Sequence, residues 1–193
     1  MDRQELLDLF RRSGALLEGH FRLSSGLHSS GYLQCALVLQ HPDAAARIGA
    51  ALGEKLRVYR PTAILSPALG GIIIGHEIAR ALGARAIFAE RQDGALMLRR
   101  GFILAEAERI VVIEDVLTTG GSTRETIQIA RASGALVVAV GAIVDRSAER
   151  AALDLPFHAL LEITFPQYEP HACPLCEQGL AIEKPGSRPS QTA

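Results

Sequence analysis

The chain has 193 residues, of which 48% are hydrophobic and 21% charged, and its formal net charge is −1. This composition is typical of one soluble globular domain and excludes a disordered chain. Because there is no basic stripe, no acidic tail and no apolar run of the roughly 18 residues that a membrane span needs, we expect no nucleic-acid partner and no membrane partner. The start M-D-R-Q-E lacks the apolar core of a signal peptide, and three cysteines are an odd count, so we expect a cytoplasmic protein.

The first 40 residues or so predict one helix followed by a small extended region. Asp2 and Glu5 have the spacing of a helix cap before an apolar stretch, and Gly14 would stop the helix. The segment Leu16–Gln34 is interrupted by glycine and serine, which predicts short strands. We expect these strands to form a hood beside the main domain.

From Pro42 onward, strands and helices alternate along the chain. Such alternation predicts an α/β fold with a central, mostly parallel sheet and helices on its faces. The apolar runs show no polar alternation, which indicates strands buried on both faces. The predicted strands are Ala63–Ser66, Arg85–Phe88, Ile110–Glu114, Ala135–Val144 and His158–Ile163, and the predicted helices are Pro42–Leu56, Ile72–Leu82 and Ser122–Ala132.

The alternation fails between Phe88 and Ile110, where no helical stripe is sustained. Asp93-Gly94 between extended-looking flanks is a hairpin turn signal, and a hairpin in place of a crossover helix predicts a lid at about residues 89–108. Beyond Pro166 the chain is rich in Pro, Gly and Ser. We expect an irregular tail there, mobile at about residues 185–193.

The stretch V-V-I-E-D-V-L-T-T-G-G-S, residues 111–122, is the most informative part of the chain. At the end of a parallel strand, the carboxylates of Glu114 and Asp115 can accept hydrogen bonds from sugar hydroxyls or hold a divalent ion. The small residues 118–122 let backbone N–H groups approach a phosphate at the start of the next helix. Alternatively, Ser122 and Glu125 form an ordinary capping box, although such a box leaves the two acids unexplained.

A second turn of the same kind, Ser66-Pro67-Ala68-Leu69-Gly70-Gly71, follows the strand Ala63–Ser66. Its two glycines free the backbone for unusual conformations and expose N–H groups to an anion, or they simply reverse the chain. If the strands that precede the two turns are neighbours, both turns lie at one edge of the sheet.

These motifs resemble those of the type I phosphoribosyltransferase family. The element Phe21-x-Leu23-x-Ser25-Gly26-x-x-Ser29-x-x-Tyr32 is similar to the N-terminal element of the orotate phosphoribosyltransferases, and Asp145-Arg146 is similar to their Asp-Arg pair. The C-P-L-C and K-P-G-S-R stretches near the C-terminus look like those of a bacterial subgroup. The resemblance covers about residues 19–188, nearly the whole chain.

The resemblance implies a single domain of residues 1–193 with a hood formed by about residues 1–40 and the C-terminal segment. It also implies a homodimer that transfers a phosphoribosyl group from 5-phosphoribosyl 1-pyrophosphate to orotate, giving orotidine 5′-monophosphate and pyrophosphate in pyrimidine (UMP) biosynthesis. Mg²⁺ would be held mainly by substrate and water, so no residue is assigned as its ligand.

The same resemblance assigns roles to individual residues. The catalytic residues would be Glu114, Asp115 and Arg91. The donor would contact these three residues and Val116, Leu117, Thr118, Thr119, Gly120, Gly121, Ser122, Ala68, Leu69, Gly70 and Gly71, and orotate would contact Thr118, Arg146, Ser25, Gly26 and Tyr32. A guanidinium group suits a carboxylated pyrimidine, because its fork can bind a carboxylate or imide at two points.

The chain departs from the family pattern in its cations. Many relatives have Lys where this chain has Ser24 and Gly70, and its lid has neither Lys nor His. The lid cations would be Arg91, Arg99, Arg100 and Arg109. Arg91 stands where the family has a phosphate-binding cation, whereas Arg99 and Arg100 either contact pyrophosphate across a subunit boundary or simply solvate a strand.

Two other functions remain open: a purine or uracil phosphoribosyltransferase, and a non-catalytic regulator that senses the pyrophosphorylated ribose. The pair Cys173-x-x-Cys176, with His171 nearby, supplies only two zinc ligands, so structural cysteines are favoured over zinc unless a two-fold dimer brings two pairs together. The remaining histidines, His20, His28, His41, His76 and His158, have no spacing that indicates a metal site.

Overall fold

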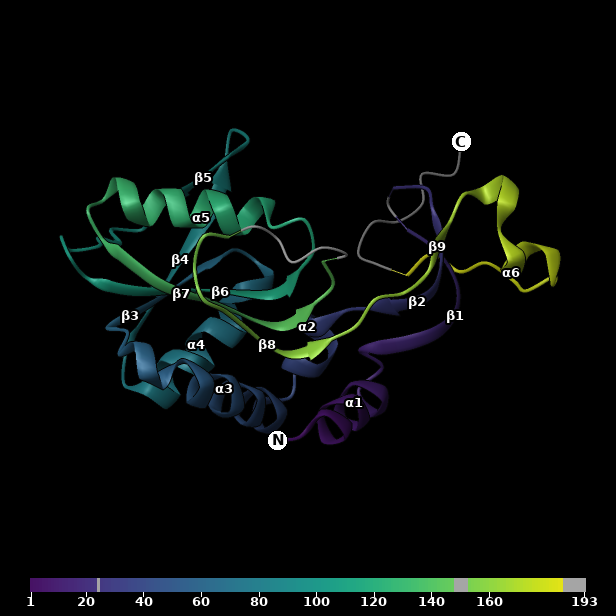
Figure 1. Cartoon of the computed structure of the whole chain (residues 1–193), viewed down its shortest axis with the longest axis horizontal. Helices are drawn as coiled ribbons and strands as arrows, with labels where there is room; N and C mark the ends of the chain where they lie inside the picture. The colour runs from purple at the N-terminus through teal and green to yellow at the C-terminus, as the bar shows by residue number, and fades with distance from the viewer. Residues whose placement is uncertain (24, 148–152, 186–193) are drawn as a thin grey trace.

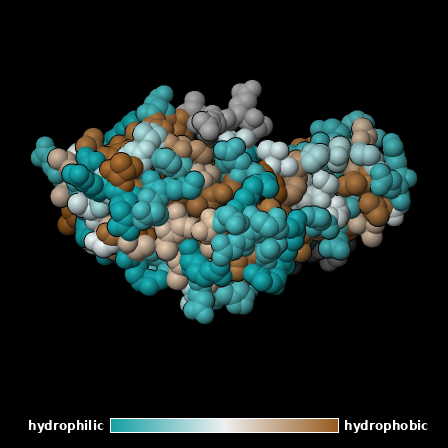
Figure 2. Space-filling view, turned by 60° about the horizontal axis from the view of Figure 1, so that its bottom comes forward, coloured by the Kyte–Doolittle hydropathy of each residue, from teal (hydrophilic) through white to brown (hydrophobic). Residues whose placement is uncertain are grey.

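The computed structural model describes residues 1–23, 25–147 and 153–185. Figure 1 shows a main α/β body joined to a smaller lobe, the hood, which contains the end of the described chain, while the N-terminus lies beside the main body. Among the helices in these residues, none combines the length and the apolarity needed to cross a membrane. Hydrophilic residues cover most of the face in Figure 2, and the hydrophobic ones form small separate groups.

The main body is a six-stranded sheet in the order β5-β4-β3-β6-β7-β8. Five strands are parallel, and β5 pairs antiparallel with β4. The predicted α/β fold is therefore confirmed. The strands are β3 (Ala63–Pro67), β4 (Arg85–Gln92), β5 (Ala95–Leu98), β6 (Arg109–Leu117), β7 (Leu136–Asp145) and β8 (Phe157–Glu162).

Helices cover both faces of this sheet (Figure 1). On one face lie α3 (Pro42–Leu56) and α4 (Gly70–Leu82), and on the other lies α5 (Gly121–Ala132). The central strand β6 is fully buried from Ile110 to Ile113, and its side chains enter two hydrophobic clusters, one on each face. Burial on both faces is why the strand is apolar without alternation.

The chain begins with α1 (Arg3–Arg12), whose buried residues Leu6, Leu7 and Phe10 join the core of the main body. Its N-cap Asp2 accepts a hydrogen bond from the backbone N–H of Glu5 at 2.8 Å, as the sequence predicted. The hood follows this helix. Its sheet has the order β1-β2-β9, with antiparallel pairing throughout. The hood strands are β1 (Leu16–Arg22), β2 (His28–Leu33) and β9 (Gln167–Tyr168), and the remaining short elements are α2 (Cys35–Leu39), η1 (Arg57–Tyr59), η2 (Pro170–Ala172) and α6 (Pro174–Glu177).

The C-terminal segment differs from the expected irregular tail, because it is attached to the hood as far as Glu183. The backbone N–H of Arg22 donates to the carbonyl of Glu183, and the N–H of Glu183 donates to the carbonyl of His20, both at 2.8 Å. These backbone hydrogen bonds join segments about 160 residues apart, which periodicity does not reveal. Residues 186–193, the predicted mobile end, lie outside the described part of the chain.

The predicted hairpin is confirmed. β4 and β5 are joined by Asp93 and Gly94, both in the left-handed region with φ of 51° and 88°, as a tight two-residue hairpin turn requires. β4 is longer than predicted, because it continues past Phe88 into the hairpin. After β5 the chain folds back through Phe102, whose ring packs edge-on against Phe88.

Candidate active site

The ends of β3, β6 and β7 lie side by side in the sheet. β3 and β7 both pair with β6 in parallel, so the turn after β3, the turn after β6 and Arg146 after β7 emerge at one edge. The backbone N–H of Arg146 donates to the carbonyl of Leu117 at 2.8 Å, which ties the ends of β6 and β7 together. The prediction that the two glycine-containing turns lie at one edge is therefore confirmed.

Glu114 and Asp115 belong to β6 itself, which continues to Leu117 instead of ending at Glu114. Both residues are partly buried. Burial, followed by the neighbouring charge of Asp115, raises the pKa of Glu114 to about 8, and burial also raises the pKa of Asp115. Without a ligand the two acids therefore tend to hold a proton between them, and a cationic ligand or hydrogen-bond donor would favour their ionised forms.

The turn after β6 leaves the start of α5 open to an anion. Gly120 is the N-cap, with φ of 73°, and no side chain caps the helix. The alternative interpretation of Ser122 and Glu125 as a capping box is therefore wrong, because Ser122 lies inside α5 and Glu125 pairs with Arg91 instead. Uncapped N–H groups at a helix start are suited to bind a phosphate.

The turn after β3 has the same property and packs closely on the acids. No side chain caps α4, which begins at Gly70. A methyl group added to Gly70 would lie 2.6 Å from Oδ1 of Asp115, closer than such atoms approach in proteins. Only a glycine allows this turn to pack against the acid.

Arg146, directly after β7, places a positive charge at this edge of the sheet. Its Nε is buried, with no hydrogen-bond partner in the described structure, and burial lowers its pKa. Its guanidinium lies 5.4 Å from the centre of the Phe165 ring. A buried donor without a partner is costly unless a ligand satisfies it, so this side chain is suited to bind an anionic or carbonyl oxygen.

Residues of the hood approach this arginine from the other lobe. Tyr32 of β2 lies close enough to Arg146 to interact with it electrostatically. The ring of Phe165 occupies the space that a side chain on Gly31 would need, so the link from the main body packs directly on β2.

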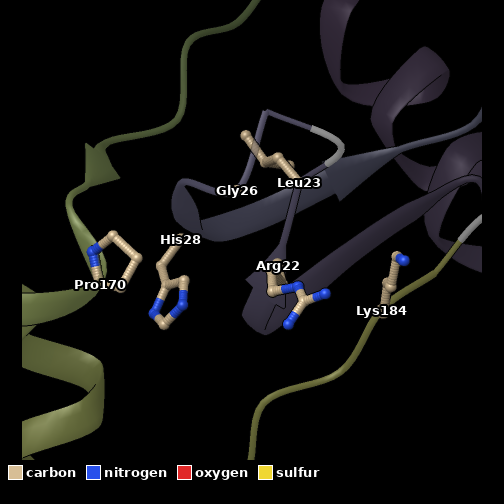
Figure 3. Close-up of a pocket in the computed structure, with 6 residues that line it drawn as sticks. All are labelled: Arg22, Leu23, Gly26, His28, Pro170 and Lys184. Atoms are coloured by element: carbon tan, nitrogen blue, oxygen red, sulfur yellow. The ribbon is translucent and has the colours of Figure 1, made fainter. Parts of the chain in front are cut away.

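The structure places the other hood residues of the predicted orotate site as follows. Ser25 is exposed, and its hydroxyl accepts a hydrogen bond from the N–H of Leu27 at 3.4 Å. Gly26, with φ of 90°, borders a cavity of about 260 Å³ inside the hood (Figure 3). Ser24 lies outside the described residues.

The lid arginines are engaged within their own chain. Arg91 forms an ion pair with Glu125 of α5 at 3.1 Å, and Arg100 contacts both oxygens of Glu90 at 2.8 and 3.0 Å. Arg99 is 3.9 Å from the same carboxylate. The placement of Arg109 in the lid was wrong: it begins β6, and its guanidinium donates to the carbonyls of Tyr59 and Arg60.

Several residues near the site were missed from the sequence. Cys35 is fully buried, and its pKa is raised well above the usual value by burial and by Asp115, which places its thiol near the acids and Arg146. Ser66 and Thr123 each bury a hydroxyl that has no partner in the described structure. No periodicity marks such residues, because their role depends on which strand ends become neighbours.

A correction concerns the histidines and cysteines. His20 and His28 come together with Cys173 and Cys176 inside one chain. The inference that these histidines belong to no metal-like grouping was wrong. No second subunit is needed to complete four ligands.

Comparison with known proteins identifies the class. Residues 36–172 match the phosphoribosyl transferase domain family. Because this match covers more than half of the chain, the protein belongs to that family.

Similar proteins narrow the class further. Orotate phosphoribosyltransferase of Heliobacterium modesticaldum is 50% identical to this chain over 97% of this chain and 100% of its own. The enzyme of Desulforamulus reducens is 46% identical, over 97% and 98%. A crystal structure of Mycobacterium tuberculosis H37Rv orotate phosphoribosyltransferase in complex with 5-phospho-alpha-D-ribosyl 1-diphosphate is 26% identical, with a TM-score of 0.65, and covers 84% of this chain and 96% of its own. The chain is a phosphoribosyltransferase of the orotate phosphoribosyltransferase group.

Proposed function

We propose that this enzyme transfers the phosphoribosyl group of 5-phosphoribosyl 1-pyrophosphate to orotate, giving orotidine 5′-monophosphate and pyrophosphate for pyrimidine (UMP) biosynthesis. One observation supports orotate above the other bases: the buried Nε of Arg146, which has no partner among the described residues and stands at the same sheet edge as the two acids and the two uncapped helix starts. A purine has no carboxylate to offer this guanidinium.

The donor is proposed to lie across the two turns. The uncapped start of α5, residues 118–122, would bind the 5′-phosphate through backbone N–H groups and hydroxyls, and the turn of residues 68–71 would bind the pyrophosphate. Val116 and Leu117 would line the ribose from the end of β6. Glu114 and Asp115 would accept hydrogen bonds from the ribose hydroxyls, and their ionised forms would favour the positive charge that develops at C1′.

Magnesium fits these residues without a dedicated cage. Two partly buried acids with raised pKa values offer oxygen atoms that gain from a nearby cation, and oxygen is the ligand that Mg²⁺ prefers. When bound with the donor, the ion would neutralise charge on the leaving pyrophosphate. The chain's own contribution is to hold ribose and phosphates in place.

Orotate is proposed to lie between the strand edge and the hood. Arg146 would bind its carboxylate or an imide oxygen at two points, and Thr118, Tyr32 and the backbone at Ser25-Gly26 would complete the contacts. The bond from N1 of orotate to C1′ forms as the bond from C1′ to pyrophosphate breaks, and the proton on N1 passes to the departing pyrophosphate. Because orotate is already an anion, positioning and charge stabilisation supply the rate without a base from the chain.

The lid and a second subunit are part of the same proposal. Residues 89–108 would close over the donor, with Arg91 exchanging Glu125 for a phosphate oxygen, while Arg99 and Arg100 would act in the site of the partner in a homodimer. The three cysteines form no disulfide, as is usual in a reducing compartment, which supports a cytoplasmic location.

Release of pyrophosphate tests the function directly. Purified enzyme is mixed with the donor and Mg²⁺, and pyrophosphate is measured with orotate, uracil or adenine as the acceptor. Of the three acceptors, we expect only orotate to give turnover. Turnover with uracil or adenine and none with orotate would show a different phosphoribosyltransferase, and donor binding without turnover of any base would indicate a regulator.

A further inference from the structure

Four potential metal ligands converge in the hood, far from the strand edge. His20 is on β1, His28 begins β2, and Cys173 and Cys176 flank the start of α6 in the C-terminal segment. One ligand atom from each residue lies within 4.8 Å of the others. Three of the four residues are buried, and Cys176 is exposed.

The distances between these atoms match a tetrahedral site. With Zn–N of about 2.0–2.1 Å and Zn–S of about 2.3 Å, neighbouring ligands lie about 3.3 Å (N to N), about 3.6 Å (N to S) and about 3.8 Å (S to S) apart. Here Nε2 of His20 is 3.0 Å from Nδ1 of His28. The sulfurs of Cys173 and Cys176 are 3.6 and 3.8 Å from Nε2 of His20, and the sulfur of Cys176 is 3.3 Å from Nδ1 of His28.

The outer contacts of His20 orient its ring for a metal. Its Nδ1 is 2.9 Å from the carbonyl of Leu180, so the N–H lies on this nitrogen and donates to that oxygen. Nε2 then presents its lone pair to the cluster. A hydrogen bond from the second ring nitrogen to a carbonyl is the usual support of a metal-bound histidine.

The C-terminal segment needs such an anchor, because it contributes almost nothing to a hydrophobic core. Between residues 162 and 185, all of them described, only Cys173 is buried. Leu180 and Ile182 remain exposed. Small lobes without a core are commonly held together by a metal or by disulfides, and all three cysteines here are free.

We propose that His20, His28, Cys173 and Cys176 form a structural zinc site within a single chain, which fastens the C-terminal segment to the β1–β2 hairpin of the hood. Two thiolates balance the charge of Zn²⁺, and two imidazoles complete a closed Cys₂His₂ set with no open position for substrate. The site is separate from the proposed magnesium and donor site, and it does not depend on the proposed reaction.

The site also adjoins the hood cavity. Figure 3 shows the ring of His28 between Pro170 and Arg22, with Lys184 on the far side of Arg22. His28 is two residues after Gly26, so a metal on His28 would hold the loop that the proposed function assigns to orotate.

Metal analysis of the full-length protein tests this site. The protein is purified without an affinity tag and without chelator, and its zinc is measured by mass spectrometry per chain. We expect about one zinc per chain, and a loss of most of it in Cys176→Ala and in His28→Ala. His171→Ala is the matched control, since this exposed histidine lies in the same segment outside the cluster and its variant keeps the zinc.

A second measurement uses wild-type protein in case these variants do not fold. Zinc is removed with a chelator and replaced with Co²⁺, which we expect to give the visible bands of tetrahedral cobalt with thiolate charge transfer. Chymotrypsin should then cut after Tyr168 or Leu180 faster in the metal-free protein than in the loaded protein.

Three results would overturn the site. The first is protein that contains no zinc and gives no tetrahedral cobalt spectrum. The second is about half a zinc per chain, which would place a Cys₄ site between two subunits instead. The third is a Cys173–Cys176 disulfide in the native protein.

Discussion

Gly70, at the start of α4, packs directly against Asp115, near the end of β6. A methyl group on Gly70 would lie 2.6 Å from one carboxylate oxygen of Asp115 and 2.7 Å from the other. Any side chain here would have to displace the acid or the turn. The glycine at position 70 is therefore linked to the position of the Asp115 carboxylate.

Gly70→Ala should lower kcat/KM for the donor by about 100-fold, because a shift of about 1 Å in a positioning group can cost that much. Steady-state kinetics with saturating orotate measures it. Gly53→Ala in α3 is the control, since its added carbon would lie at an ordinary 3.4 Å from Cβ of Ala81 in α4. This variant should behave like wild type. Unchanged kinetics in Gly70→Ala would mean that the turn moves freely.

Arg146→Ala should raise KM for orotate about 10- to 100-fold, since a hydrogen bond to a charged group contributes about 1.5–3 kcal/mol. Arg146→Lys should recover little of this loss, because an ammonium group cannot replace a two-point fork. Arg131→Ala, an exposed arginine at the end of α5, is the control. If KM for orotate stays the same while KM for the donor rises, Arg146 contacts the donor instead.

Glu114 should make the ligand-free enzyme less stable as pH rises. Its pKa is near 4.5 in the unfolded chain and about 8 in the folded protein, so the folded state holds the extra proton between these values. The stabilisation is complete below about pH 4.5 and is lost as pH rises through about 8.

Thermal unfolding of wild type and Glu114→Gln between pH 5.5 and 8.5 measures this effect. Wild type should lose at least about 3 °C more than the variant, since 1 kcal/mol corresponds to about 2–4 °C in a chain of this size. The pH-dependent contributions of all other groups are the same in both proteins, so they cancel from the difference between the two profiles. Parallel pH profiles would show that Glu114 is not perturbed. Donor binding should become tighter over the same range, because it favours the ionised acid.

Arg91 and Glu125 should separate when the donor binds. Arg91→Ala should raise KM for the donor about 10-fold or more, as expected for a charge-assisted contact to phosphate. Glu125→Gln should leave KM equal or lower, because it frees Arg91. The exposed ion pair itself should contribute less than about 1 kcal/mol to stability, measured by a double-mutant cycle in urea. A rise in donor KM in Glu125→Gln would show that the ion pair holds Arg91 in its working position.

Local patterns predicted much of the fold. The cap at Asp2, the helix Pro42–Leu56, the hairpin at Asp93-Gly94 and the strand–helix alternation depend on neighbouring residues, and all are present. The boundaries moved where packing decided them, as in β6, which runs on through the two acids. The spacing of Ser122 and Glu125 resembled a capping box, but α5 begins one residue earlier and no side chain caps its exposed N–H groups.

The sequence by itself determined the α/β class, the order of the elements and the two glycine-containing turns after β3 and β6, because periodicity and turn chemistry act over a few residues. Only the tertiary structure decided the burial that raises the pKa of Glu114. It also decided that Nε of Arg146 is buried without a hydrogen-bond partner among the described residues. It also brought Cys173 to within 3.6 Å of His20, 153 positions earlier in the chain. Such contacts depend on which strands become neighbours and on how the C-terminal segment returns to the hood, and no local pattern records either.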